Sequence, residues 1–300
     1  MHLLFVGNGY AVAEKPAGLL SEPGGGSKES FFDALQEFLE KESGNKQPLF
    51  PVHRLDRAVG GVMIFATDKG AAARLSLPSA MRKFYLAVVK GRTEKCGTYR
   101  DFLYKDPKTN KTFIAKSQRR GVREAALHFK TLASVSAPGG DAYSLVLIAL
   151  ETGRSHQIRV QFASRRHPIV GDGKYGGSDN AAKNIALFSC LLAVNADLTE
   201  NAAPRAKVSA ESGQGSAGTG RVGASNAQIS AAAGQVFATD KKFSAPDERQ
   251  LTGSDGKSPF ALHENCHTYC CFPPQVYPWT LFSPAEISAA EEIFSRKSRK

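Results

Sequence analysis

The apolar residues of this 300-residue chain fall mainly into short runs that have the length and spacing of β-strands. Apolar runs bounded by Gly, Pro, Asn or Ser are typical of strands, whereas longer periodic patterns are typical of helices. The runs lie at residues 3–6, 10–14, 62–66, 82–91, 125–133, 142–150 and 185–193. We therefore expect a strand-rich domain with helices only at intervals.

Capping signals predict where these helices begin. Ser30 can form a reciprocal cap with Asp33, and the apolar stripe behind it would dock the helix on a core. Further helices are expected to begin at Asp68, at Ser155 after the turn at Gly153, and at Ser283. The last of these is expected to run to about residue 294.

The composition changes sharply after residue 193. Residues 194–258 are rich in Gly, Ala, Ser and Lys and contain almost no aromatic residues. Such a segment cannot bury enough apolar surface to offset the entropy lost on ordering. Because residues 268–272 again have strand composition, we expect residues 1–193 and 259–300 to form one domain, with 194–258 as a disordered insertion.

The charge balance indicates a class of partner. Lys and Arg total 39 and Asp and Glu total 28, an excess that favours nucleic acid first and an anionic membrane surface second. No apolar run approaches the ~20 residues of a membrane-spanning helix, and the N-terminus lacks the pattern of a signal peptide. Five cysteines without disulfide-type spacing are typical of a reducing compartment. We expect a cytoplasmic protein.

Residues 53–57 concentrate the charged groups most suited to chemistry. Asp56 lies between Arg54 and Arg57, directly before the apolar run 62–66. Neighbouring cations favour the ionised form of a carboxyl, and an ionised, oriented carboxylate can serve as nucleophile or base. A structural ion pair on a loop explains these residues alone equally well.

A second polar group lies at residues 151–160. Arg159 follows Ile158 on the expected helix, and this apolar setting favours pairing inside the protein over exposure to solvent. Between the two groups, the basic stretch 98–123 carries interleaved aromatic residues and is expected to form a hairpin or a long loop. RNA contact and a merely solvated cationic face fit this stretch equally well.

Two other chemistries are disfavoured. Zinc-type ligands cluster near the C-terminus, but their spacing fits no standard zinc site, so no metal is expected. They are His263, Cys266, His267, Cys270 and Cys271. The chain also lacks the G-x-S-x-G signature of a serine hydrolase.

Four motifs follow one another in a specific order. They are EKPAGLLSEPG near the start, HRLDRAVGG at 53–61, RKFYLAVVKG at 82–91 and TGRSHQIRVQFASRRHPIVGDGKYGG at 152–177. Together they closely resemble the pseudouridine synthases of the RluA family, over residues 3–193 and 268–283. The resemblance implies an α+β fold, the pseudouridine synthase catalytic fold: a mixed, mostly antiparallel sheet with flanking helices and an RNA-binding cleft.

The resemblance also implies roles for individual residues. Asp56 corresponds to the catalytic residue, Tyr85 to a tyrosine that lies against the target uracil and can act as base, and Arg159 to the partner of the catalytic carboxylate. Residues of the same motifs are expected to bind substrate, with Arg54 displacing the target base from its stack. These are Arg54, His53, Arg154, His156 and Gln157.

The implied reaction is the isomerisation of a uridine in rRNA or tRNA to pseudouridine. The base is cut from its ribose at nitrogen, turned and rejoined through carbon, with no cofactor and no metal. The chain departs from the family where Val59-Gly60-Gly61 replaces Thr-Ser-Gly, which removes two hydroxyl groups near Asp56. It also begins without the S4-type RNA-binding domain that many members carry, and we expect a monomer.

Two alternatives remain. The first is a catalytically inactive RNA-binding module on the same fold, which the presence of Asp56, Tyr85 and Arg159 together disfavours. The second is a carboxylate-dependent hydrolase acting on a nucleoside or sugar. That enzyme needs a second acidic residue, for which Asp172 is the only candidate in a matched motif, although its family role is structural.

Overall fold

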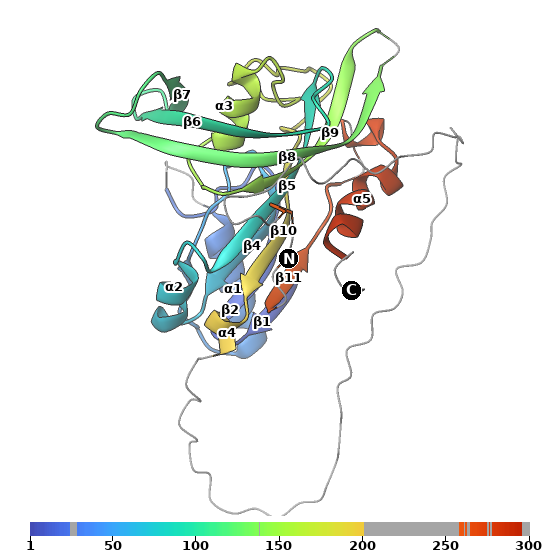
Figure 1. The fold of residues 1–300 in the computed structure, drawn as a ribbon. Helices are drawn as coiled ribbons and strands as arrows, with labels where there is room; N and C mark the ends of the chain where they lie inside the picture. The colour runs from blue at the N-terminus through green and yellow to red at the C-terminus, as the bar shows by residue number, and fades with distance from the viewer. Residues whose placement is uncertain are drawn as a thin grey trace, which may run out of the picture. The chain divides into compact units, whose positions relative to one another are not determined.

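One mixed sheet runs through the part of the chain that the structure describes (Figure 1). The computed structural model describes residues 1–24, 29–137, 139–200, 258–260, 262, 265–274, 276 and 278–295. Its strands are β1 (His2–Gly7), β2 (Tyr10–Lys15), β3 (Phe50–Pro51), β4 (Gly60–Ala66), β5 (Met81–Lys90), β6 (Cys96–Asp106), β7 (Lys111–Ala115), β8 (Val122–Ser136), β9 (Ala142–Leu150), β10 (Leu187–Asn195) and β11 (Cys266–Cys270). They lie in the order β1-β2-β4-β10-β5-β9-β8-β6-β7, with β3 beside β4 and β11 beside β10.

The strand pairing confirms the expected sheet. Every described pair is antiparallel except β4 with β10, so the sheet is mixed and mostly antiparallel. Strands occur at each of the seven apolar runs named from the sequence. Of the two expectations for the basic stretch 98–123, the hairpin is the one observed, since β6 and β7 pair directly.

The central strands explain why their sequences read as unbroken apolar runs. All of β4 and nearly all of β9 and β10 are buried. A strand covered on both faces needs apolar residues at consecutive positions, whereas one facing water needs them only at alternate positions. The result is a continuous core with few buried polar side chains, among them Ser144 and Ser189 inside β9 and β10.

Five α-helices and one short 3₁₀ helix flank the described sheet. They are α1 (Phe31–Ser43), α2 (Lys69–Leu75), α3 (Gln157–Ser164), α4 (Asp197–Glu200), η2 (Trp279–Leu281) and α5 (Pro284–Ser295). Helix α1 docks through its apolar stripe, where the Phe31 ring lies 5.9 Å from that of Phe65 in β4. Figure 1 shows α3 beside the β6–β7 hairpin and α5 on the other side of the sheet's long strands.

Three of the four predicted caps are confirmed. Ser30 and Asp33 form a reciprocal capping box, Asp68 accepts from the Ala71 amide, and Ser283 and Glu286 cap α5. The helix expected near Ser155 is also present, as α3 from Gln157, but Ser155 does not cap it, because His156 in a left-handed turn is the N-cap residue. The Ser155 carbonyl accepts from the Thr112 hydroxyl instead, so a tertiary contact replaces the local cap.

The boundary expected between residues 193 and 194 falls inside β10, which α4 then follows. Residues 201–257, the rest of the expected insertion, lie outside the described residues, as does His263 of the zinc-type cluster. In the described ranges no three His, Cys, Asp or Glu side chains gather as they would around a metal ion.

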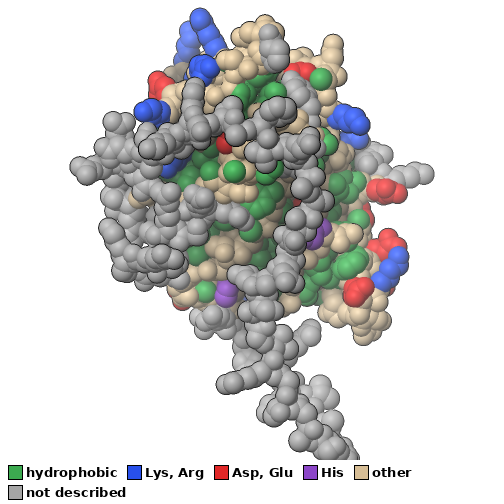
Figure 2. All heavy atoms as spheres, turned by 90° about the vertical axis from the view of Figure 1, so that its right-hand side faces the viewer, with side chains coloured by type: hydrophobic (Ala, Val, Ile, Leu, Met, Phe, Trp, Pro, Cys, Tyr) green, Lys and Arg blue, Asp and Glu red, His purple; other side chains and the backbone are tan. Residues whose placement is uncertain are grey.

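The face around β11 and α5 is drawn in Figure 2. Its described hydrophobic side chains lie mostly across the middle, and its charged side chains lie mostly around the rim. Within the described helices, none is both long enough and apolar enough to cross a membrane.

Candidate active site

Asp56 lies on the loop between β3 and β4, and neighbouring residues fix this loop tightly. The buried side chain of Leu55 anchors the loop to the core. The Ser21 hydroxyl donates to the Leu55 carbonyl at 2.7 Å and accepts from the Leu55 amide at 3.0 Å. The Val59 amide bonds the Asp56 carbonyl at 2.9 Å and closes the turn. A carboxylate on such a loop is placed by its backbone.

Lys15, the last residue of β2, supports the same loop from below. Its side chain is fully buried, and Nζ donates to the carbonyls of Pro16, Leu19 and Arg57 at 2.8, 2.6 and 3.3 Å. Burial lowers the pKa of Lys15 to about 8, although the charge of Asp56 acts in the opposite direction. Lys15 therefore ties the EKPAG turn to the loop that carries the candidate carboxylate.

Within Val59-Gly60-Gly61, the glycine shared with the family pattern, Gly61, has a structural reason. Its φ is +121°, and a Cβ there would lie 2.2 Å from the Ser189 carbonyl oxygen of β10. Only glycine fits such a close approach of two backbones. Gly61 is part of β4 rather than of the turn, and Val59 is buried. An apolar contact thus occupies the position where the family pattern has a hydroxyl.

Arg159 of α3 lies between two carboxylates. Its Nη1 donates to Asp56 Oδ2 at 2.8 Å, while Nε and Nη2 bind the two oxygens of Asp172 at 2.7 and 2.8 Å. Burial alone would lower the pKa of Arg159, but the hydrogen bonds and charges of Asp172 and then Asp56 outweigh burial, so the pKa is raised above its usual value. The guanidinium is thus oriented by Asp172 and presented to Asp56, which matches the predicted pairing.

Asp172 differs from Asp56 in its exposure. The side chain of Asp172 is 1% exposed and that of Asp56 is 27% exposed. Both oxygens of Asp172 are bound to Arg159, so this carboxylate has no face turned to a substrate. It cannot act as the second acidic group that a glycosidase-type hydrolase requires.

Tyr85 of β5 lies beside Asp56 at the floor of a cleft. Burial raises the pKa of Tyr85 far above its usual value, and the charge of Asp56 raises it further, while a hydrogen bond with Ser189 acts in the opposite direction. A phenol in this setting stays protonated. It can offer its ring and a hydroxyl donor to a base, but forming a phenolate is strongly disfavoured.

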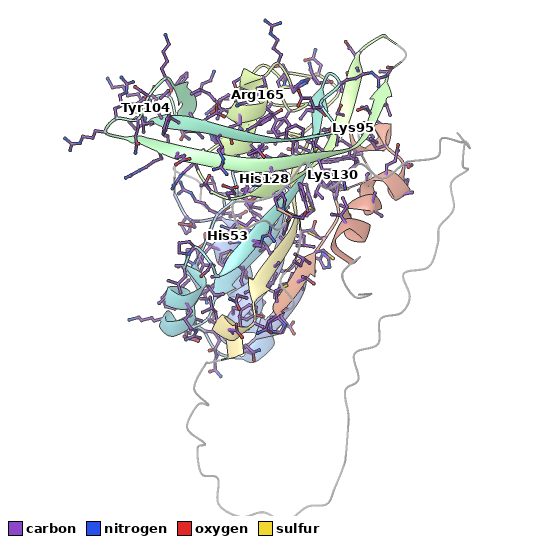
Figure 3. The ribbon with its side chains drawn as sticks, in the orientation of Figure 1. His53, Lys95, Tyr104, His128, Lys130 and Arg165 are labelled. Atoms are coloured by element: carbon purple, nitrogen blue, oxygen red, sulfur yellow. The ribbon has the colours of Figure 1, made fainter. Side chains whose placement is uncertain are left out.

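His53 and Lys83 form the opposite wall of the cleft (Figure 3 labels His53). His53 Nε2 accepts from the Ile64 amide at 3.2 Å, so its proton is on Nδ1, which is shielded from water and has no partner among the described residues. Burial and then the charge of Lys83 hold the pKa of His53 well below its usual value. Burial also lowers the pKa of Lys83.

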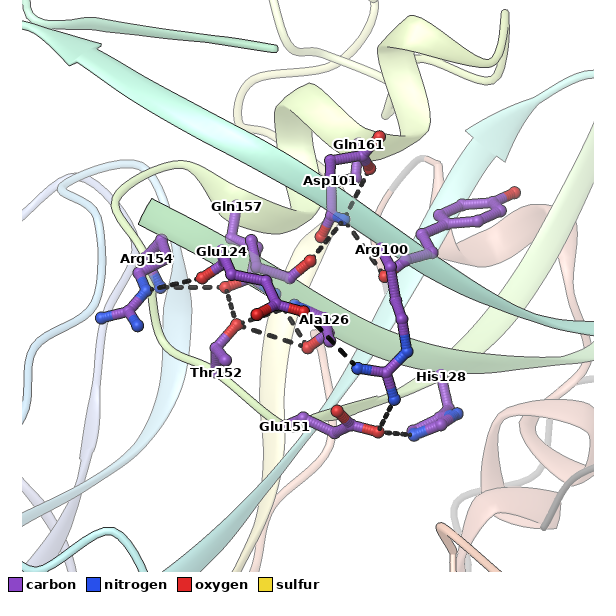
Figure 4. Close-up of polar contacts among 12 residues, drawn as sticks. Arg100, Asp101, Glu124, Ala126, His128, Glu151, Thr152, Arg154, Gln157 and Gln161 are labelled. Atoms are coloured by element: carbon purple, nitrogen blue, oxygen red, sulfur yellow. Dashed lines mark hydrogen bonds and ion pairs between the residues drawn. The ribbon is translucent and has the colours of Figure 1, made fainter. Parts of the chain in front are cut away.

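Gln157 and Arg154 belong to a polar network above the cleft (Figure 4). Gln157 Oε1 accepts from the Thr152 hydroxyl and the Arg154 amide, and Nε2 donates to the Ala126 carbonyl. The Gln157 amide therefore shapes the loop 152–154. The Arg154 guanidinium, held through Nε by the Glu124 carbonyl at 3.0 Å, remains exposed at the cleft wall.

The cleft brings together every residue that the sequence assigned to the site. It has a volume of about 290 Å³ and is lined by Asp56, Tyr85 and Arg159 together with His53, Arg54, Arg154, His156 and Gln157. Sequence reasoning missed Lys83, which lines the same cleft, and Tyr175, which contacts Arg159 and His156. Both residues lie inside the quoted motifs, two positions before Tyr85 and three after Asp172, so their position was the available signal.

The comparison with known families now decides the assignment. The profile of the RNA pseudouridylate synthase family matches residues 9–164, which include the Asp56 loop, the Tyr85 strand and the Arg159 helix. The chain belongs to this family. This membership explains why residues of separate motifs converge on one cleft.

Individual relatives with similar sequences are also named as pseudouridine synthases. The chain is 32% identical over 194 residues to the RNA pseudouridine synthase YhcT of Bacillus subtilis, with 63% of this chain and 62% of that protein aligned. It is 34% identical to the tRNA pseudouridine synthase C of Vibrio parahaemolyticus, over 56% of this chain and 70% of the relative. It is also 29% identical to the ribosomal large subunit pseudouridine synthase D of Borreliella burgdorferi, over 66% of this chain and 62% of that protein. The chain thus spans less than two thirds of the length of some relatives.

A solved structure supports the fold. Human RNA pseudouridylate synthase domain containing 1 superimposes with a TM-score of 0.53 at 23% identity, covering 64% of this chain and 78% of that one. The expected α+β pseudouridine synthase fold is therefore confirmed.

Proposed function

We propose that this protein isomerises specific uridines of rRNA or tRNA to pseudouridine, with Asp56 as the catalytic residue. The observation that carries the proposal is the arrangement at the cleft floor. Asp56 is a half-exposed carboxylate whose Oδ2 is bound by Arg159 at 2.8 Å, beside a buried tyrosine in a cleft of nucleoside-like size.

The two oxygens of Asp56 have different surroundings. Oδ2 is bound to Arg159 and lies 3.7 Å from His156 Nε2, whereas Oδ1 has no hydrogen bond from any described residue. Oδ1 is therefore the oxygen available for reaction. Attack at the sugar and addition to the base both need one oriented, unencumbered carboxylate oxygen, and this arrangement serves either route.

Tyr85 and Arg54 complete the proposed site. The uracil must leave the RNA stack to reach Asp56, and unstacking costs a few kcal/mol. A flipped uracil can rest against the Tyr85 ring, while Arg54, exposed at the cleft rim, can fill the space that the base leaves. The name of the Vibrio relative specifies tRNA and that of the Borreliella relative specifies the large ribosomal subunit, which supports these two RNA classes as substrates.

A second hollow extends the cleft and offers a path for the flanking nucleotides. It has a volume of about 320 Å³ and shares Lys83, Leu150 and Arg154 with the first. Exposed cations of the β6–β7 hairpin and its flanks supply further positive charge, which would neutralise phosphates. They are Lys105, Lys108, Lys116, Arg119, Arg120 and Arg123.

The decisive experiment supplies purified protein with rRNA and tRNA from cells lacking its gene, followed by mapping of pseudouridine by carbodiimide or mass spectrometry. We expect conversion of one or a few uridines. Asp56→Asn removes the reactive oxygen at nearly constant volume, so it should retain its melting temperature and lose at least ~1,000-fold in rate, the scale of removing a covalent catalyst. Conversion by Asp56→Asn at the wild-type rate, or binding without conversion by the wild type, would refute the proposal.

The domain organisation belongs to the same proposal. We infer that residues 1–193 and 259–300 form the catalytic domain. We also infer that this unit works as a monomer, because one chain supplies every wall of the described cleft. Its five cysteines form no disulfide, and we therefore place the protein in the cytoplasm. Deleting residues 201–257 should leave the melting temperature unchanged within about 5 °C, and light scattering should give the mass of one chain. A larger loss of stability, or a dimer, contradicts this arrangement.

A further inference from the structure

The Tyr175 hydroxyl joins three parts of the chain at the edge of the cleft. Tyr175 lies on the loop between α3 and β10, and its oxygen accepts from the Thr112 amide of β7 at 2.8 Å. The same oxygen lies 2.8 Å from His156 Nδ1. Thr112 in turn donates its hydroxyl proton to the Ser155 carbonyl at 2.9 Å. The β6–β7 hairpin and the start of α3 therefore meet at one phenol.

The direction of these bonds follows from the groups involved. A backbone amide can only donate, so the phenol oxygen is the acceptor in its bond with Thr112. The phenol then has one proton of its own to place. His156 Nδ1, 2.8 Å away, can accept that proton when the imidazole carries its own proton on Nε2. Burial raises the pKa of Tyr175, which keeps this proton on the phenol.

The bond to Tyr175 bears on which ring nitrogen of His156 carries the proton. A neutral imidazole carries its proton on one nitrogen, and the hydrogen bond made by the other nitrogen decides which one. The Nδ1–phenol bond fits either direction, and the surroundings of the other nitrogen favour Nδ1 as the acceptor: a proton on Nε2 faces Asp56, whereas the opposite tautomer would turn the Nε2 lone pair toward that carboxylate. That nitrogen is 3.7 Å from Asp56 Oδ2, the oxygen already bound by Arg159. Burial favours the neutral ring by lowering the pKa of His156, with Asp56 and Asp172 opposing this and Arg159 and Lys174 reinforcing it.

The backbone holds the ring in this place. His156 has φ 52° and ψ 21°, a left-handed conformation that only a few per cent of residues other than Gly adopt, with Asn, Asp and His the most frequent among them. Such strain persists where the surroundings determine it and is concentrated at functional sites. The rings of His156 and Tyr175 meet edge to face, 5.6 Å apart at 84°. The imidazole thus has one position and one neighbour that sets its tautomer.

We propose that Tyr175 is a positioning residue that fixes the proton of His156 on Nε2, so that an N–H donor faces Asp56 and the substrate space above it. This rests on the proposed function, in which Asp56 is the catalytic residue. A donor at this point faces Oδ2 from 3.7 Å, beyond hydrogen-bond distance, while Arg159 binds that oxygen and Oδ1 is left to react. The N–H is therefore free to donate to a uracil or ribose oxygen when the substrate enters.

The first test reads the tautomer directly and needs no activity. In protein labelled with ¹⁵N-histidine, nitrogen shifts and couplings distinguish Nδ1–H from Nε2–H, and loss of one signal set in His156→Gln assigns His156 among the seven histidines. We expect His156 to be Nε2–H in the wild type. Tyr175→Phe keeps the ring that lies 5.2 Å from the Arg159 guanidinium but removes the hydroxyl, so the Nδ1–H form should appear.

The matched control is Tyr104→Phe, a change on the β6–β7 hairpin that the Tyr175 hydroxyl contacts (Figure 3). The Tyr104 hydroxyl makes no hydrogen bond to the rest of the described chain, so this change should leave the His156 signals unaltered. An Nδ1–H tautomer in the wild type, or an unchanged tautomer in folded Tyr175→Phe, overturns the inference. Because the wild-type spectrum is itself decisive, the test does not depend on how Tyr175→Phe folds.

The second test measures rate. Tyr175→Phe should lower kcat roughly 2- to 10-fold, the range for losing one hydrogen bond between neutral groups, with little change in KM. Gln can place an amide N–H near the Nε2 position, so Tyr175→Phe should cause little further loss in a His156→Gln background. A full additional loss there means that Tyr175 acts by another route. If the wild type converts no RNA, the proposed function fails, while the tautomer assignment still stands or falls on its own spectrum.

Discussion

The two walls of the cleft differ in how far their polar groups are satisfied. On the α3 side, Arg159 is bound on three nitrogens by two carboxylates, and Asp172 uses both oxygens. On the β5 side, the Lys83 ammonium makes no hydrogen bond or ion pair with any described residue, and the Nδ1–H of His53 has no partner there either. His53 Nδ1 is shielded from water, whereas Lys83 is partly exposed.

This difference distinguishes two functions that buried polar groups can have in a binding site. A satisfied group is fixed before the substrate arrives and adds little cost when it binds. An unsatisfied group costs stability in the free protein, and a ligand that supplies the missing partner recovers that cost. The α3 wall therefore suits orientation of the catalytic carboxylate. The β5 wall suits binding of an acceptor such as a phosphate or a uracil carbonyl.

The largest effect is expected on the satisfied wall. Arg159→Ala leaves the buried Asp172 and the half-exposed Asp56 without their cation, which should cost ~3–5 kcal/mol of unfolding free energy and abolish activity. Adding Asp172→Asn should recover more of this loss than adding Asp56→Asn, because Asp172 is far more buried. Denaturant unfolding of the single and double variants measures both. Equal recovery, or strictly additive losses, would show that the two carboxylates do not depend on Arg159 as the geometry indicates.

The opposite sign is expected for Lys83. Lys83→Met removes a partly buried charge whose pKa burial lowers, and it keeps the length of the side chain, so the free protein should gain about 1 kcal/mol. Affinity for substrate RNA should fall about tenfold as one cation contact is lost. Lys95→Met, at the exposed lysine labelled in Figure 3, is the control and should change neither quantity appreciably. A destabilised Lys83→Met with unchanged RNA affinity would remove the distinction between the walls.

The smallest effect concerns the pH dependence of His53. Its pKa is lower in the folded than in the unfolded chain, so below about pH 6.5 the unfolded state binds the extra proton and stability falls as the pH falls. His53→Gln keeps an acceptor for the Ile64 amide but cannot titrate. Between pH 6.5 and 5.5 it should therefore lose up to about 1 kcal/mol less than the wild type. Parallel stability curves would show that His53 is protonated in both states.

The sequence was informative where the cause of structure is local. The capping box at Ser30 and the apolar run of β4 each depend on residues a few positions apart, and both were correctly predicted. The cap at Ser155 was not, because the helix begins two residues later and the Ser155 carbonyl binds Thr112, 43 positions away. The convergence of the site residues came from family resemblance.

Other features could not have been found by local rules. The close approach of Gly61 to Ser189 depends on the parallel pairing of β4 with β10, which brings together residues far apart in the chain. Whether the Lys83 ammonium has a hydrogen-bond partner depends on which groups the rest of the fold places beside it. Local propensity carries no information on either point, whereas packing determines both.

The pairing of β10 with β11 has a consequence for how chains of this kind can diverge. Asn195 and Cys266 are register partners, so the sheet itself holds the two ends of the connection between them. For a connection anchored in this way, doubling its length costs only about 0.6 kcal/mol in closure entropy. Segments can thus be gained, shortened or exchanged between these strands while the loop of Asp56 and the guanidinium of Arg159 keep their places. The edge of β11 is a point at which evolution, or an engineer, can attach a new segment without rebuilding the enzyme.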